Sequence, residues 1–357
     1  GLAHFKPTDL SKLLSGRQLS VSPYISERLE GIRGTSTPKD LETALQLVHL
    51  YFTSPRKDST IFRNIIDQSI TAIANRNTDP NSVFADTVSA VLGDHSIRRT
   101  GPTVEKLNQI DLEKSLAIYK ERFANAGDFT FVFDGNFSVD SIRPLLEKYL
   151  GSLPGQPQKE SARDLKIHIP TGKIEATAIK GREPKASVRL VVSGDYQYSP
   201  ENNIQLTALG EILQFRIIDR LREKEGGTYS PGVRVTYNKY PANRYAFTIS
   251  FGCAPDNVEK LINDTKEEIA KLKTSGVTAL DITKFSTEEQ RQYELHLKDN
   301  GFWLNWLIAQ YENGDDPATI LKYPELIKQV NPASVKAAAN LYLNEDNFIK
   351  LVLLPEK

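Results

Sequence analysis

Two side chains with hydrogen-bonding chemistry stand close together in the second half of the chain. In "LREKEGGTYSPG", residues 221–232, Arg222 precedes Tyr229 by seven residues across a Gly-Gly pair. A guanidinium and a phenol can both donate hydrogen bonds to a bound group. The pair also has a purely structural interpretation, because an arginine near a helix end interacts well with the helix dipole and a tyrosine suits the start of a strand. Spacing alone favours the structural interpretation.

Other catalytic motifs are missing from the sequence. The five histidines form neither H-E-x-x-H nor the inverted H-x-x-E-H, the helical pairs that hold zinc beside a glutamate base. No phosphate-binding loop and no G-x-S-x-G nucleophile elbow occurs. The single cysteine, Cys253, ends an alternating apolar run, which favours a structural thiol over a nucleophile. We therefore expect no metal ligand and no cofactor site in this chain.

Length and charge limit the class of protein. The chain has 357 residues, enough for two domains, and 45 basic residues balance 45 acidic ones. No long basic run indicates nucleic-acid binding, and no apolar run reaches the length of a membrane span. These features are typical of a globular protein that neither binds nucleic acid nor spans a membrane.

The chain repeats itself weakly. "GIRGTSTPKDLE" at 31–42 resembles "ISFGCAPDNVEK" at 249–260, and "IDLEKSLAIYKERFANAGDFTFVFDG" from 110 resembles "VNPASVKAAANLYLNEDNFIKLVLLP" from 330. Both comparisons give nearly the same offset, which predicts two tandem homologous domains of about 200 residues. We place them at 1–155 and 165–357, joined by a Gly- and Pro-rich linker. By this offset the first domain lacks roughly its first 50 residues.

Hydrophobic patterns predict the elements of the second copy. An amphipathic helix begins at Ser199-Pro200 and ends at Gly226-Gly227, which suit a left-handed cap. Strand-like segments joined by short turns must be antiparallel, and we expect helices to cover one face of their sheet. The fold class is therefore α+β, with a mostly antiparallel sheet in each copy. The remaining expectations are strands at 129–135, 173–181, 186–198 and 347–354, a hairpin at 232–252, helices at 256–274 and 278–312, and helices after Pro317 and Pro332.

The segment "FRIIDRLREKEGGTYSPGV" closely resembles the second half of the insulinase/pitrilysin-family zinc metallopeptidases, where it takes the form L-R-x-x-x-x-x-x-Y after a long helix. "SVSPYISE", "STPKDLETALQLVHLYFTSPRKD", "DYQYSPEN" and "NGFWLNWL" are similar to bacterial periplasmic-type members. The resemblance covers essentially the whole chain.

The resemblance implies a concrete function. In the family, two halves of two α+β domains each enclose a peptide chamber; the first half holds zinc, and the second supplies an Arg/Tyr pair but no metal ligand. Arg222 and Tyr229 match that pair, and 1–155 and 165–357 would be the third and fourth domains. The two donors would bind substrate and stabilise the oxyanion, where one such donor is worth roughly 2.7–4 kcal/mol. The implied partners are the zinc-bearing N-terminal half and a peptide substrate, in the bacterial periplasm or cell envelope.

Two alternatives remain open. A chain without the zinc motif cannot hydrolyse peptides by itself, so it is either the C-terminal part of a longer enzyme or the non-metal subunit of a two-chain peptidase. A catalytically inactive interaction or scaffold module of the same fold is the other possibility. The Arg/Tyr pair favours the enzyme, because a scaffold has no need of it.

Overall fold

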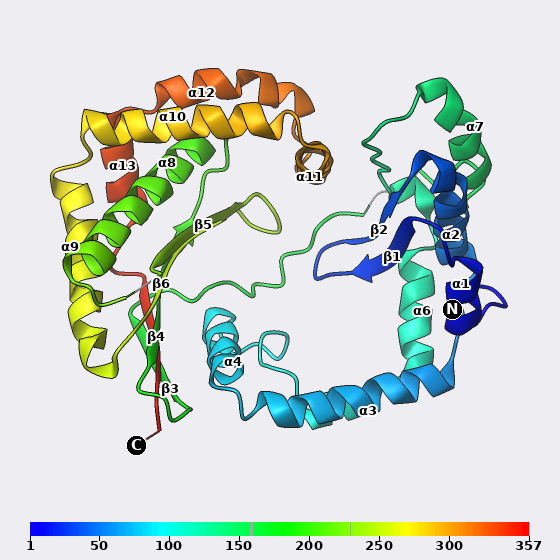
Figure 1. The fold of residues 1–357 in the computed structure, drawn as a ribbon, viewed down its shortest axis with the longest axis horizontal. Coiled ribbons are helices and arrows are strands. Elements are labelled where there is room, and N and C mark those ends of the chain that lie inside the picture. The colour runs from blue at the N-terminus through cyan, green and yellow to red at the C-terminus, as the bar shows by residue number, and fades with distance from the viewer. Residues whose placement is uncertain (158–159, 229, 357) are drawn as a thin grey trace. The chain divides into compact units, whose positions relative to one another are not determined.

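A computed structural model describes residues 1–157, 160–228 and 230–356 and divides the chain into two compact units (Figure 1). Unit 1 consists of Gly1–Ala72 and Thr103–Arg163, and unit 2 of Ile73–Pro102 and Asp164–Lys357. One division falls near residue 163, inside the predicted linker. The units nevertheless differ from the ranges 1–155 and 165–357, because residues 73–102 pack with the second unit.

Unit 1 contains one antiparallel hairpin and a set of helices. Strands β1 (Leu19–Ile25) and β2 (Glu30–Ser36) pair from Leu19↔Ser36 to Ile25↔Glu30. A single turn led by proline, η1 (Pro38–Asp40), then opens α2 (Leu41–Thr53). The other elements are α1 (Pro7–Leu13), α5 (Val104–Asn108), α6 (Leu112–Arg122), η2 (Ala126–Asp128), α7 (Val139–Tyr149) and most of α3 (Ser59–Arg76).

Aromatic side chains form part of the unit 1 core. Phe52 of α2 meets Phe123 edge to face at 5.3 Å between ring centroids, and Phe129 at 4.9 Å. The predicted strand at 129–135 is wrong, because the described structure forms no strand there. A strand exists only where a neighbouring strand accepts its backbone hydrogen bonds, and the described part of unit 1 contains only the β1–β2 pair.

Unit 2 is built on a five-stranded sheet with the order β3-β7-β4-β6-β5. β4 (Ala186–Asp195) pairs antiparallel with both β6 (Arg244–Cys253) and β7 (Phe348–Leu354). β5 (Gly232–Asn238) pairs antiparallel with β6, whereas β3 (Ile174–Ile179) runs parallel to β7. The α+β class and the predicted 232–252 hairpin are confirmed, with one parallel pair at the β3 end.

Helices cover both faces of this sheet, so the prediction of one covered face is wrong. α8 (Pro200–Ile217), α9 (Val258–Thr274) and α13 (Pro332–Tyr342) lie on one side, and α4 (Pro80–Leu92) lies on the other (Figure 1). α4 buries Phe84, Val88 and Val91 against residues of β3, β4 and β7, including Val191. Both faces of β4 are therefore buried, which explains its nearly continuous apolar run.

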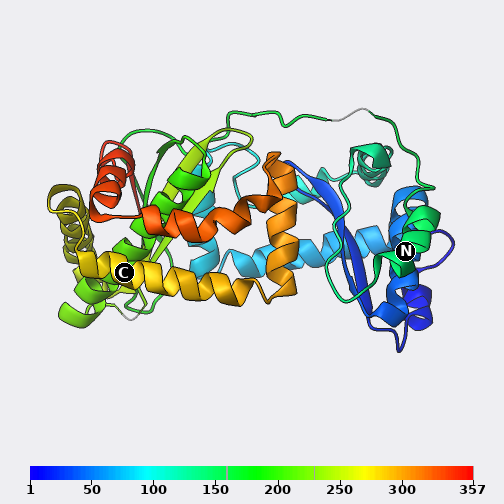
Figure 2. The same cartoon turned by 90° about the horizontal axis from the view of Figure 1, so that it is seen from above.

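Helix ends follow local capping chemistry. Ser199 caps α8 by accepting a hydrogen bond from the Asn202 backbone N–H at 3.1 Å, as predicted. The predicted helix at 278–312 is two helices, α10 (Ala279–His296) and α11 (Asn300–Asn313). Asp299 accepts from the Phe302 N–H at 2.6 Å, and this new N-cap starts α11 in a different direction (Figure 2). The chain continues through η5 (Pro317–Lys322) and α12 (Tyr323–Gln329), close to the predicted helix after Pro317.

Candidate functional site

The segment that carries Arg222 is a π-helical extension of α8. This element, η3 (Ile218–Lys224), continues α8 without a break, with Leu221 fully buried and Arg222 exposed. The Arg222 side chain is 49% exposed, and its Nε donates to the carboxylate of the adjacent Glu223 at 2.7 Å. π-Helical turns are rare and often occur at functional sites. The guanidinium is thus available at the surface, and among the described residues Glu223 on the same turn is its ion-pair partner.

A glycine turn follows the end of this helix at Lys224. Gly226 has φ +59°, in the left-handed region, and its N–H donates to the carbonyl of Arg222 at 3.2 Å. The Gly227 N–H donates to the Leu221 carbonyl at 3.1 Å, so the predicted left-handed cap is confirmed. A Cβ on Gly227 would lie 2.9 Å from Leu261 of α9. The close approach of α9 therefore favours glycine at this position.

Tyr229, the second predicted donor, lies outside the described residues. The structure describes its surroundings: Thr228 is buried, with 5% of its surface exposed, and β5 starts at Gly232. Arg222 is therefore placed on an exposed helical end, and its approach to the Tyr229 phenol remains a prediction.

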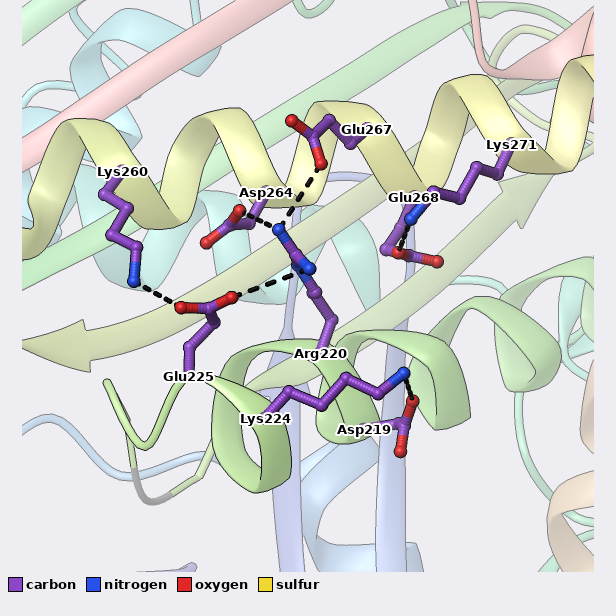
Figure 3. A network of polar contacts seen from close by, with 9 residues as sticks. All are labelled: Asp219, Arg220, Lys224, Glu225, Lys260, Asp264, Glu267, Glu268 and Lys271. Atoms are coloured by element: carbon purple, nitrogen blue, oxygen red, sulfur yellow. Dashed lines mark hydrogen bonds and ion pairs between the residues drawn. The ribbon is translucent and has the colours of Figure 1, made fainter.

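An ion-pair network ties η3 to α9 (Figure 3). Arg220 Nη2 donates to Asp264 Oδ1 at 2.5 Å, and Nη1 lies 3.5 Å from Glu225 Oε1. Glu225 also pairs with Lys260 of α9, and this pair is the first cause of the lowered pKa of the Glu225 carboxyl. Asp264 is only 5% exposed, so its charge is balanced within the network rather than by water.

The network holds the chain on both sides of Arg222. Arg220 precedes Arg222 by two residues and Glu225 follows it by three, and both are held against α9. Sequence reasoning missed these residues, although Asp264 carries a signal. It lies three residues after the buried Leu261, so helical periodicity places a carboxylate on the apolar face of α9. A charge at such a position calls for a partner, here Arg220.

Two other titratable side chains, Cys253 and His49, are structural. Burial raises the pKa of the Cys253 thiol to about 11, so this buried cysteine stays protonated, in agreement with a structural thiol. His49 Nδ1 lies 2.9 Å from the carbonyl oxygen of Tyr149, within unit 1. In the described part of the chain, no three His, Cys, Asp or Glu side chains gather into a possible metal site. The residues present therefore do not fit a zinc ion.

Comparison with known proteins gives the same family as the resemblance found in the sequence. Residues 109–285 match the family model described as the peptidase M16 inactive domain. The chain belongs to the peptidase M16 inactive-domain family. It is 28% identical over 293 residues, 77% of its length, to a plant protein described as "Zinc protease PQQL-like", from Arabidopsis thaliana. The family resemblance inferred from the sequence is thus confirmed.

Two solved structures from Escherichia coli show the fold. The periplasmic protease PqqL superposes over 100% of the chain with a TM-score of 0.85 at 21% identity. The first half of the same protease covers 99% of the chain with a TM-score of 0.78 at 12% identity. The chain spans 30% of the length of its plant relative and 39% of PqqL. Among the described residues, no helix is both long and apolar enough to cross a membrane.

Proposed function

We propose that this chain forms the C-terminal, non-metal half of a zinc-dependent peptidase, lines part of its substrate chamber and supplies Arg222 and Tyr229 to the substrate carbonyl. One structural observation supports the proposal most directly. Arg222 is exposed on a π-helical end that the Arg220–Asp264 network holds in place. A flexible helix end would not need such an anchor, whereas a side chain that must meet a reacting carbonyl does.

The proposed chemistry is stabilisation of developing negative charge. Addition to a peptide carbonyl places charge on the carbonyl oxygen, and a guanidinium fork together with a phenol O–H are suitable donors for that atom. The metal would be held by the other half of the enzyme, in agreement with the relatives described as zinc proteases. In this division of labour, the present chain binds and orients the carbonyl and stabilises its charge.

Substitution of Arg222 in the intact enzyme tests this role. We expect Arg222→Ala to lower kcat by about 10²- to 10³-fold, as for loss of one oxyanion donor, while KM changes much less. Arg222→Lys keeps the charge but not the planar fork, so it should recover only part of the activity. Lys224→Ala is the matched control, because Lys224 is also a cation on η3 and pairs with Asp219 at 2.8 Å.

Tyr229→Phe isolates the second donor. Loss of the phenol O–H should lower kcat more than it raises KM. If both Arg222→Ala and Tyr229→Phe leave kcat unchanged, the pair has only a structural role, and an inactive interaction module or partner subunit becomes the better description.

The partner and compartment belong to the same proposal. We place the enzyme in the periplasm or cell envelope, with a zinc-bearing N-terminal half as its partner and peptides as substrates. The likeness of the chain to the periplasmic PqqL, and to the first half of that protease, supports both statements. Fractionation of cells that produce the intact protein would contradict the compartment if all of it were found in the cytoplasm.

The division into 1–155 and 165–357 is likewise proposed as two copies of one domain. In unit 1 the order is β2, the proline-led turn η1 and α2. In unit 2, β6 is followed by the proline-led turn η4 (Pro255–Asn257) and α9. This repeated order supports duplication. Experimental coordinates in which the shared elements fail to superpose would contradict it.

A further inference from the structure

The outer edge of β5 carries a side-chain substitute for a neighbouring strand. Within the described part of unit 2, β5 is the last strand of the sheet and pairs only with β6. The side-chain amide of Gln214, from α8, bonds once to the strand and once to the residue before it. Its Nε2 donates to the Pro231 carbonyl at 3.1 Å, and its Oε1 accepts from the Val233 N–H. One amide thus makes the two bonds that a peptide group of an adjacent strand would make.

The Gln214 contact fixes which backbone groups face outward. Because the Val233 N–H bonds to Gln214, it does not point toward β6. In a β-strand, the backbone N–H and C=O groups of every second residue point to the same edge. Val235 and Tyr237 therefore present their backbone groups on the same outer edge as Val233. Both lie opposite β6 residues, in the pairs Val235↔Phe247 and Tyr237↔Tyr245. Gln214 covers only the start of the edge, and among the described residues no further strand pairs with the part from Val235 onward.

A groove of about 470 Å³ lies between this edge and α8. Val235 and Tyr237 line it from β5, and Gly210 and Glu211 line it from α8. Gly210 matters for the shape, because a Cβ at this position would collide with the Val235 side chain. The volume lies in the range of sites that hold a ligand or a few side chains.

Glu211, which lines the groove, belongs to an acidic pair. Glu211 hydrogen-bonds to Glu289 of α10, and Tyr323 of α12 donates to Glu289. Within the described ranges, neither Glu211 nor Glu289 takes part in an ion pair. Three cations of neighbouring elements are engaged elsewhere: Arg216 pairs with Asp281, Lys239 with Asp315 and Arg291 with Glu288.

Burial and the neighbouring carboxylates keep Glu211 partly protonated. The largest cause is the loss of water around the carboxyl, followed by the negative charges of Glu289 and then Glu288. Together they raise the pKa of the Glu211 carboxyl to about 7. The partly buried Tyr237 lines the same space from β5, and its phenol carries no positive charge. A cation brought in from outside would therefore find an uncompensated acidic group at the floor of the groove.

We propose that this groove binds an extended peptide segment, which adds as a further strand to β5 from Val235 onward and places a lysine or arginine side chain against Glu211. The free edge explains the extended conformation, because main-chain hydrogen bonds to Val235 and Tyr237 require a strand. The acidic pair explains the basic side chain, and it disfavours an acidic one by like-charge repulsion. Arg222 is not among the residues that line the groove, and the proposal does not depend on the enzymatic role proposed above.

Peptide binding to the purified 357-residue chain tests the proposal. The probe is the fluorescein-labelled, C-terminally amidated peptide Ser-Thr-Val-Lys-Val-Thr-Ser, and its matched control carries Gln in place of Lys. Fluorescence anisotropy at pH 8 should give about tenfold tighter binding for the Lys peptide, as for one charge-assisted contact. Glu211→Gln should remove this preference. Glu201→Gln, an exposed glutamate on the first turn of the same helix, should retain it.

A second pair of variants tests strand addition separately from charge. Val235→Pro removes the outward N–H but no bond to β6, and it should weaken both peptides at least tenfold. Val235→Ala keeps the N–H and loses the same packing, so it should bind close to wild type. Circular dichroism of each variant checks that the sheet is retained. Equal binding of the Lys and Gln peptides, absence of binding, or Lys-peptide binding that Val235→Pro leaves intact would each overturn the proposal.

Discussion

Glu211→Gln should make unit 2 more stable at pH 8 and change its stability much less at pH 5. The pKa of the Glu211 carboxyl is raised to about 7 in the folded chain, against 4.5 as its ordinary value. Between these values the folded state binds more protons than the unfolded state, so the stability falls as the pH rises. Gln carries no charge at any pH, and its amide can still donate to Glu289. The variant therefore loses only the cost of ionising Glu211 inside the fold.

The size of the effect follows from the same pKa difference. At pH 8 the full difference corresponds to about 3 kcal/mol. Glu211 is only half-buried, and solvent screening reduces this figure to about 1–2 kcal/mol. At pH 5, where the folded carboxyl is protonated, the variant and the wild type should differ by a few tenths of a kcal/mol.

Urea denaturation followed by tryptophan fluorescence measures the free energy of unfolding of unit 2, and so the difference between the variant and the wild type. Both tryptophans, Trp303 and Trp306, lie in α11 of unit 2, and their indole N–H groups donate to the carbonyls of Leu297 and Pro317 at 3.0 Å. Their emission reports the unfolding of the unit that contains Glu211. A gain in stability of equal size at both pH values, or no gain at pH 8, would refute the account of the acidic pair.

Three further predictions concern packing, the α9 network and metal content. Phe84→Ala should destabilise unit 2 by about 3–5 kcal/mol in the same fluorescence assay, because it empties the core beneath β4 and β7; a loss below 1 kcal/mol would mean that α4 does not cover the sheet. Asp264→Asn should lower the free energy of unfolding by about 1–3 kcal/mol, because it removes the buried charge that pairs with Arg220. The exposed control Lys260→Gln should lower it less, and equal losses in the two variants would contradict the network. Metal analysis of the purified chain should find no stoichiometric zinc, and one zinc per chain would contradict the proposed division of ligands between halves.

Helices and the hairpin of unit 2 are predictable because their signals are local. The α8 face of Leu209, Leu213 and Ile217 repeats at helical spacing and is fully buried, and capping residues mark both ends of the helix. The break between α10 and α11 was missed although its signal is also local. Asp299 is a strong N-cap residue within an otherwise continuous helical pattern.

Features that depend on distant parts of the chain were not predictable in the same way. The apolar face of α4 shows that the helix is buried but not which sheet it covers. The segment 129–135 has the composition of a strand, yet a strand also requires partners. The Arg220–Asp264 and Glu211–Glu289 contacts join elements far apart in sequence, so single-sequence patterns cannot assign them. Exposure of Arg222 next to a glycine cap could be predicted, because both follow from the helix end itself.

The assignment of residues 73–102 to unit 2 affects how pieces of this protein can be exchanged with those of relatives. The backbone passes from one unit to the other three times, near residues 72, 102 and 163. A chimaera joined only at the linker would therefore give the C-terminal sheet a foreign α4. To inherit a matched core, a transplanted C-terminal unit must bring its own copy of residues 73–102.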